Sequence, residues 1–277
     1  MKSILALAAA SSLALVPAQA AMMLDFNSTN QDGGPHPEAG YLSYDAGHEV
    51  AADFVAKSYS VTFTNTGAAT VTVTPNWPNT TANTVQQMID RSSSQNDGNW
   101  QGNNIDLLTD WLGTDSRTNN GGNGDYDGTN GTPTYLTIAL GGLSADTYSW
   151  TSFHHDTEKM TSDFYLEIST DGGATYAMVG GTHTMTHSTS GGIPNTPTTT
   201  NALNGDPHNL SSTVTTTFDA DGTNDVVIRL TPLGNAGTGV HTMFVGINGF
   251  ELDQVPEPSS LLMLLAGGLF LGVRRRR

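Results

Sequence analysis

The alternation of apolar and polar residues along the chain predicts a protein built from β-strands. The clearest segments alternate with a period of two and are rich in β-branched and aromatic residues, which suit a pleated surface. They are residues 59–65, 71–74, 134–140, 147–155, 164–169, 175–179, 212–218, 225–230 and 243–252, and 22–26 reads as a short edge strand. About eight to ten such strands with long polar loops indicate an all-β fold, most simply an antiparallel β-sandwich of the jelly-roll type.

Turn residues divide these strands in a way that favours hairpins. Thr66-Gly67 lies between 59–65 and 71–74, and Pro75 should end the second strand because it cannot donate to a ladder. Asp171-Gly172-Gly173 predicts a tight turn that folds 175–179 back onto 164–169. Polar stretches at 119–131 and 182–210 read as exposed loops.

Two segments carry apolar residues at helical rather than alternating spacing. They are 83–90, with Val85, Met88 and Ile89 on one face, and 105–112, which includes Trp111 and ends before a glycine. We therefore expect one or two short helices as excursions between strands.

The first twenty residues have the three parts of a secretory signal peptide. Lys2 supplies the positive start, 4–16 is apolar, and Ala18-Gln19-Ala20 fits a small-residue cleavage site. We expect a signal helix that signal peptidase removes after Ala20, which leaves 21–254 as the exported domain.

Residues 255–277 also fall into three consecutive segments of different composition. Pro256-Glu257-Pro258 favours an extended backbone, an uncharged apolar run follows at 261–273, and Arg274 to Arg277 close the segment. As a helix, this run would be about 20 Å long against a hydrocarbon core of about 30 Å, so it needs flanking residues and snorkelling arginines to span. We expect a transmembrane helix with the four arginines, Arg274, Arg275, Arg276 and Arg277, on the cytoplasmic side.

This three-part segment resembles the PEP-CTERM sorting signal. The resemblance rests on Pro256, Glu257 and Pro258, the apolar run and the basic cluster, about 23 residues in all. It implies that exosortase, a membrane cysteine enzyme, cleaves near Pro-Glu-Pro. The protein would be anchored transiently in the inner membrane and then reach the cell surface or the extracellular matrix. The chain has no cysteine, so it would be a substrate of that system and not the enzyme.

Charge narrows the range of partners of the exported domain. Residues 21–254 hold five basic and 25 acidic residues, a net charge of −20. Such a surface repels nucleic acid and anionic membranes and could favour cations such as calcium. The chain has no cysteine, so no disulfide stabilises the fold and no thiolate can act as a nucleophile or metal ligand. Stability must therefore come from a hydrophobic core.

One polar cluster, 153–158, could carry chemistry. On a strand, His154 and Asp156 share a face, as do Tyr148, Trp150 and Ser152. His154 and Asp156 are candidates for ligand binding or catalysis, although their spacing matches no known zinc motif. Hydrogen-bonded polar residues at a strand end are the simpler interpretation.

Carboxylates at alternate positions suggest a calcium loop at two places. Asp219 and Asp221 with Asp225 form one, and Asp125 and Asp127 the other. Alternate carboxylates can converge on one ion, but neither segment has the bidentate Glu of an EF-hand. Ordinary Asp-Gly turns explain the same pattern.

Tryptophans offer a further binding surface, since aromatic faces pack against sugar rings. Trp77 and Trp100 lie in polar surroundings and are the better candidates for exposure, whereas Trp150 should be core. Residues 135–155 and 226–252 resemble galactose-binding-like and carbohydrate-module jelly rolls, which implies a sandwich that binds glycans. No catalytic motif such as G-x-S-x-G is present.

These features favour an exported, non-enzymatic protein that binds extracellular polysaccharide or builds matrix. The alternative is a secreted glycan hydrolase that uses carboxylates or His154 and Asp156. A purely structural surface protein is a third possibility.

Overall fold

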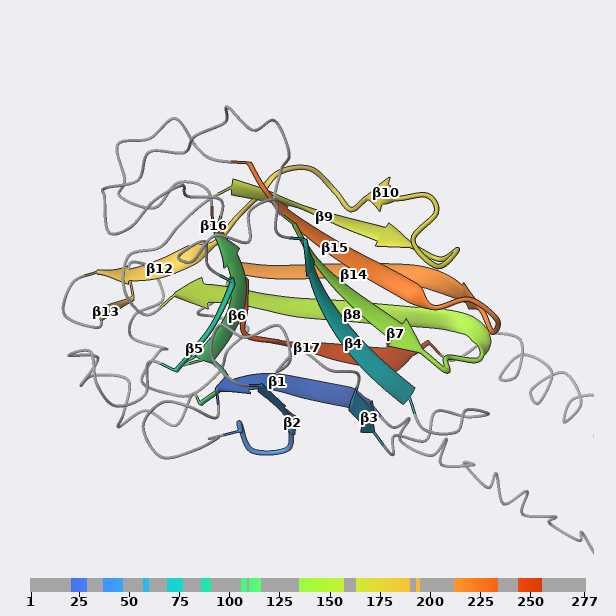
Figure 1. Ribbon diagram of the computed structural model, residues 1–277, viewed down its shortest axis with the longest axis horizontal. Coiled ribbons are helices and arrows are strands. Elements are labelled where there is room, and N and C mark those ends of the chain that lie inside the picture. Colours follow the sequence, from blue (N-terminus) through green and yellow to red (C-terminus); the bar gives the residue numbers. More distant parts are fainter. Residues whose placement is uncertain are drawn as a thin grey trace, which may run out of the picture.

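The computed structural model describes residues 21–28, 37–46, 57–59, 69–76, 86–90, 106–108, 110–115, 135–156, 163–189, 193–194, 212–233 and 244–255. Within these residues, two large sheets and one small sheet form a β-sandwich (Figure 1). The first sheet runs β13 (Ile193–Pro194), β12 (Thr186–Thr189), β8 (Ala145–Asp156), β17 (Gly249–Gln254), β1 (Met22–Ser28) and β2 (Leu42–Ala46), with β14 (Ser212–Asp221) also on β8.

The second sheet lies across the core from the first. It runs β10 (Ala177–Met178), β9 (Asp163–Ser169), β15 (Val226–Pro232), β7 (Tyr135–Gly141), β4 (Ala69–Asn76) and β3 (Lys57–Tyr59), with β11 (His183–Thr184) also on β9. The small sheet is β16 (Phe244–Ile247), β6 (Asp110–Asp115) and β5 (Gln86–Asp90).

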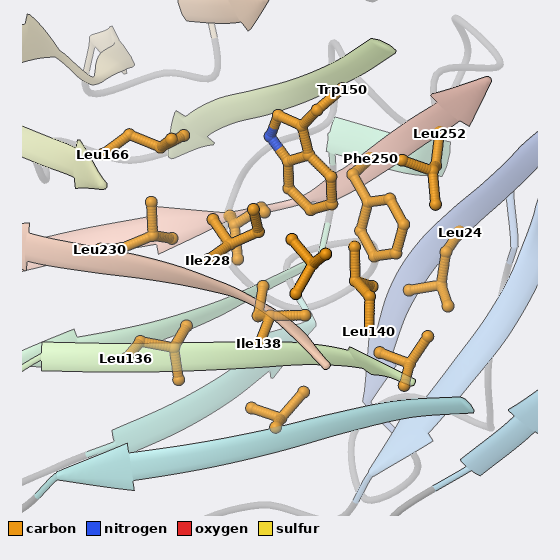
Figure 2. Packing of buried hydrophobic residues seen from close by; sticks show 14 of the residues in the cluster. Leu24, Leu136, Ile138, Leu140, Trp150, Leu166, Ile228, Leu230, Phe250 and Leu252 are labelled. Atoms are coloured by element: carbon orange, nitrogen blue, oxygen red, sulfur yellow. The ribbon is translucent and has the colours of Figure 1, made fainter. Parts of the chain in front are cut away.

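The alternation in the sequence sorts side chains to the two faces of each sheet. In the second sheet, Leu136 and Ile138 of β7 and Ile228 of β15 are fully buried between the sheets. Figure 2 shows these side chains facing Trp150 and Phe250 of the first sheet. The Trp150 and Phe250 rings stack with centroids 4.3 Å apart, a contact worth about 1 kcal/mol beyond the area it buries.

Most predicted strands are confirmed, and the chain crosses between the two large sheets at β7–β8–β9 and at β14–β15. The chain passes from β7 to β8 through Gly142 and from β14 to β15 through Gly222, both with positive φ. The Asp171 turn returns β10 antiparallel onto β9. β3 pairs with β4, but of the predicted strand 59–65 only Tyr59 is among the described residues, and Thr66-Gly67 lies outside them. Pro75 does not end its strand, because β4 continues to Asn76.

The predicted helix at 83–90 is wrong, and the one at 105–112 is reduced to a single 3-10 turn. Residues 86–90 form β5, and 105–112 holds a short 3-10 turn at Asp106–Leu108 followed by β6. In the antiparallel register Met88 pairs with Leu112 and Ile89 with Trp111. Trp111 and Leu112 are both fully buried, so tertiary packing outweighs the helical spacing.

Three smaller expectations also need correction. β1 is not an edge strand, because it lies between β17, antiparallel, and β2, parallel. Residues 182–210 are not all loop, since β11, β12 and β13 fall within them. The predicted strand at 243–252 is two strands in different sheets, separated at Asn248.

The predicted signal and C-terminal helices lie outside the described residues. In the part of the chain that the structure describes, no helix is long and apolar enough to cross a membrane.

Candidate functional site

The outer face of the second sheet carries a group of tyrosines around one ion pair. We call it the outer tyrosine face, made of Tyr135 on β7, Tyr165 and Glu167 on β9, Arg229 on β15 and Tyr176 before β10. Because the neighbours of the four strand residues in sequence, among them Leu136, Leu166 and Leu230, are buried in the core, alternation directs those four side chains away from it.

The strand register brings these residues into two adjacent rows. Arg229 stands opposite Glu167 on one side and Thr137 on the other. In the next row, Thr231 stands opposite Tyr165. Tyr135 directly precedes Leu136, which pairs with Leu230, so in this antiparallel register Tyr135 lies on the other side of Thr231. Since strands lie about 4.8 Å apart, Tyr135 and Tyr165 flank β15 at about 10 Å.

Arg229 and Glu167 form a two-pronged ion pair at the centre of the face. Arg229 Nε donates to Glu167 Oε2 at 2.7 Å, and Nη2 donates to Oε1 at 2.9 Å. The side chains are 26% and 17% exposed, so the pair is partly shielded from water. These hydrogen bonds to Glu167 raise the pKa of Arg229, although desolvation opposes them.

Aromatic rings cover the guanidinium of Arg229. Its Cζ lies 3.7 Å from the Tyr176 ring centroid and 5.6 Å from that of Tyr135, both within cation–π range. Partial burial raises the pKa of Tyr176, against the influence of Arg229, so this phenol stays a neutral hydrogen-bonding group.

The hairpin that carries Tyr176 is held by Asp171. Its Oδ1 accepts from Ser169 Oγ at 2.6 Å and from Thr175 N at 2.9 Å, and Oδ2 accepts from Thr175 Oγ. Hydrogen bonds from Ser169 and Thr175 hold the pKa of Asp171 well below its ordinary value. Gly173 N also donates to Ser169 Oγ, which fixes the approach to Tyr176.

His154 lies at the other side of the core and is fully buried. Its Nε2 is 2.8 Å from Ser152 Oγ, and its Nδ1 is 2.7 Å from the Gly246 carbonyl oxygen. A Ser–His contact of this kind could activate a nucleophile, but Ser152 and His154 are both 0% exposed and closed to a substrate. Burial lowers the pKa of His154 to about 4. Asp156 is the last residue of β8.

The three aspartates of the candidate calcium loop are not gathered as a metal site. Asp221 Oδ1 accepts from the backbone N–H groups of Thr223 and Asn224, each at 2.7 Å, as an Asx turn does. Asp219 Oδ1 accepts from Thr147 Oγ. Neither these residues with Asp225 nor any other described His, Cys, Asp or Glu side chains form a group of three that could hold a metal ion.

The remaining candidates divide between core and undescribed parts of the chain. Trp150 is core as predicted, and Trp111 is fully buried too. Trp77, Trp100 and the Pro256-Glu257-Pro258 segment lie outside the described residues.

The sequence reading missed the outer tyrosine face. Alternation already placed Tyr135, Tyr165, Glu167 and Arg229 on outward positions of three predicted strands. Alternation does not give the strand order β9-β15-β7, which places strands that are distant in sequence side by side.

Comparisons with known proteins concern the two parts of the chain separately. No curated protein matches the chain. Among solved structures, it is similar to the CBM32 of AlyQ in complex with 4,5-unsaturated mannuronic acid, at 16% identity over 53% of this chain and 80% of that chain, with a TM-score of 0.27.

A second similar structure comprises the CBM22-1–GH10 modules of Clostridium thermocellum endo-1,4-β-D-xylanase 10B, complexed with xylohexaose. It is 12% identical over 76% of this chain and 29% of that chain, with a TM-score of 0.30. The K3 adhesin domain of Porphyromonas gingivalis Lys-gingipain is 11% identical over 53% and 75% of the two chains, with a TM-score of 0.28.

The C-terminal segment gives the specific match. Residues 254–277 fit the PEP-CTERM protein-sorting motif, which confirms the resemblance of the Pro-Glu-Pro, apolar and arginine parts. This motif implies an exported protein that is held in the membrane by its C-terminal segment before exosortase processes it. The chain carries a PEP-CTERM protein-sorting motif behind a β-sandwich domain.

Proposed function

We propose that this protein is an exported, non-catalytic glycan-binding protein of the cell surface or extracellular matrix. The outer tyrosine face is the observation that carries the proposal. Tyr135 and Tyr165 present rings on a rigid sheet, and a sugar ring can pack its apolar face against them. Thr231 stands between the two rings, and Thr137 and Glu167 lie in the adjacent row; all three carry groups that can bind sugar hydroxyls.

The sorting motif supports the location of this activity. Signal peptidase would cleave after Ala20, and exosortase would process the segment that begins at Pro256. The 21–254 domain would then meet polysaccharide outside the cell. Trp77, Trp100, His154 and Asp156 stay predictions for the binding of that ligand.

Two features of the described residues support a non-catalytic role. Catalysis on a glycan needs an accessible acid and base. The outer tyrosine face offers one carboxylate, Glu167, and both of its oxygens already accept hydrogen bonds from Arg229. The Ser152–His154 pair is closed to solvent.

An array of bacterial and plant polysaccharides tests the proposal. The mature protein, purified from its native host, should bind at least one glycan and release no reducing ends from it during prolonged incubation. Absence of binding across the array, or turnover of a bound glycan, would overturn the proposal.

A further inference from the structure

The outer tyrosine face holds one positive charge, and that charge is already matched. Both oxygens of Glu167 accept hydrogen bonds from Arg229, and the Tyr176 ring covers the guanidinium at 3.7 Å. Charge-assisted pairs of this two-pronged form are among the stronger polar contacts in proteins. A carboxylate on an incoming sugar would have to displace Glu167, an anion fixed on the neighbouring strand, to reach Arg229.

The described part of this face offers no second positive charge to an anion. Among the side chains described on this face, Arg229 is the only cation, and its neighbours Thr137, Thr231, Tyr135 and Tyr165 are neutral. The exported domain has a net charge of −20, so the long-range field also opposes an acidic polymer. Neutral hydroxyls, by contrast, can donate to Glu167 and to the threonine oxygens without a charge penalty.

We propose that Glu167 makes the outer tyrosine face selective for uncharged glycans and excludes those rich in uronic acids. This inference rests on the proposed glycan binding and adds the class of ligand and the residue that sets it. Glu167 acts by holding Arg229: without its carboxylate, the same guanidinium becomes a site for sugar carboxylates. Specificity here comes from a repulsive group as much as from an attractive one.

The test compares neutral with acidic hexasaccharides on the full chain in a detergent without a sugar headgroup. Cellohexaose and laminarihexaose are the neutral probes, and hexamannuronate and hexagalacturonate are the acidic ones. We expect the wild type to prefer a neutral probe at least about tenfold. Glu167→Gln keeps the size of the side chain and should improve binding of an acidic probe by roughly 1.5- to fivefold, the range of a partly exposed ion pair. The double variant E167Q/R229Q should lose that gain.

The outcomes separate the two proposals. If the wild type binds acidic and neutral probes equally well, the selectivity is contradicted while glycan binding stands. If it binds none of the probes or array glycans, glycan binding fails and the selectivity falls with it. Near-UV circular dichroism and the unfolding midpoint report whether E167Q stays folded. If E167Q does not fold, the test is the affinity of the wild type for neutral and acidic probes, measured at low and at high salt. A preference for neutral probes at both salt concentrations supports the inference, and a preference for acidic probes overturns it.

Discussion

The side chain of Asn248 takes the place of a strand neighbour for the backbone of His155. Asn248 Oδ1 accepts from His155 N at 2.6 Å, and Asn248 Nδ2 donates to His155 O at 3.1 Å. The Asn248 backbone bonds Phe153 O through its N–H and Phe26 N through its carbonyl, both at 2.9 Å. At this residue the chain leaves the small sheet and enters the first sheet. Asn248 therefore joins the backbones of β8 and β1 at the point where β17 begins.

Asn248→Ala should destabilise the fold by about 2–4 kcal/mol. The change removes both hydrogen bonds between the Asn248 side chain and the buried backbone of His155, and the loss of such a buried bond costs about 1–3 kcal/mol. Urea unfolding measures the loss. Asn224→Ala is the matched control, because Asn224 lies in an exposed turn, and it should cost less than about 1 kcal/mol. Equal losses for the two variants would contradict the role of Asn248.

Gly249→Ala tests the close approach of β17 to its surroundings. A Cβ at Gly249 would lie 2.4 Å from Leu24 O and 2.5 Å from Leu107 Cδ1, so the backbone of β1 or the small cluster around Leu107 must move. We expect a loss of about 1–3 kcal/mol in unfolding free energy. Gly181→Ala meets nothing within 4 Å and should change stability by less than about 0.5 kcal/mol. An unchanged Gly249→Ala protein would show that the strand packing is different.

Stability should fall as the pH drops from about 6.5 to about 4, in part because of His154. Burial favours the neutral ring and lowers the folded pKa of His154 to about 4, below its ordinary value of 6.5. Between these pH values His154 is protonated in the unfolded chain but neutral in the folded chain. Its contribution to the unfolding free energy, at most on the order of 3 kcal/mol, is therefore present above pH 6.5 and lost as the pH falls to about 4.

Unfolding free energies at several pH values, compared between wild type and His154→Gln, isolate this effect. The groups that face the ring are Ser152, the Gly246 carbonyl, Phe164 and His183. His183→Gln is the control, since it removes a histidine but keeps the buried one. The expected result is a shallower pH dependence in His154→Gln than in His183→Gln. If the two slopes are the same, His154 does not titrate as argued.

Local pattern predicted the strands well because period-two alternation directly reports which side chains face a core. It failed at 83–90 and at 105–112. In the second segment, Trp111 and Leu112 lie on opposite faces of β6 and are both buried, so the apolar residues do not alternate and their spacing fits a helix instead. It could not find the outer tyrosine face, since Arg229 meets Glu167 across 62 residues of sequence. Pairings of that range depend on sheet order, which alternation does not encode.

Replacing Pro256-Glu257-Pro258 by alanines tests the sorting half of the account in the native host. The wild type should lose its apolar run and arginines, and the variant should keep them and stay with the membrane. Mass spectrometry of the mature C-terminus reads both results. An intact C-terminus in both proteins would make this segment an ordinary anchor.

The most direct test of glycan binding is calorimetric titration of the best array glycan into three proteins. Relative to wild type, Tyr135→Ala/Tyr165→Ala removes two rings from the outer tyrosine face, each worth about 1 kcal/mol, and should weaken binding at least about tenfold. Thr215→Ala/Thr217→Ala alters the exposed face of β14 on the opposite sheet and should bind as the wild type does. Equal affinity of all three proteins would contradict glycan binding at this face.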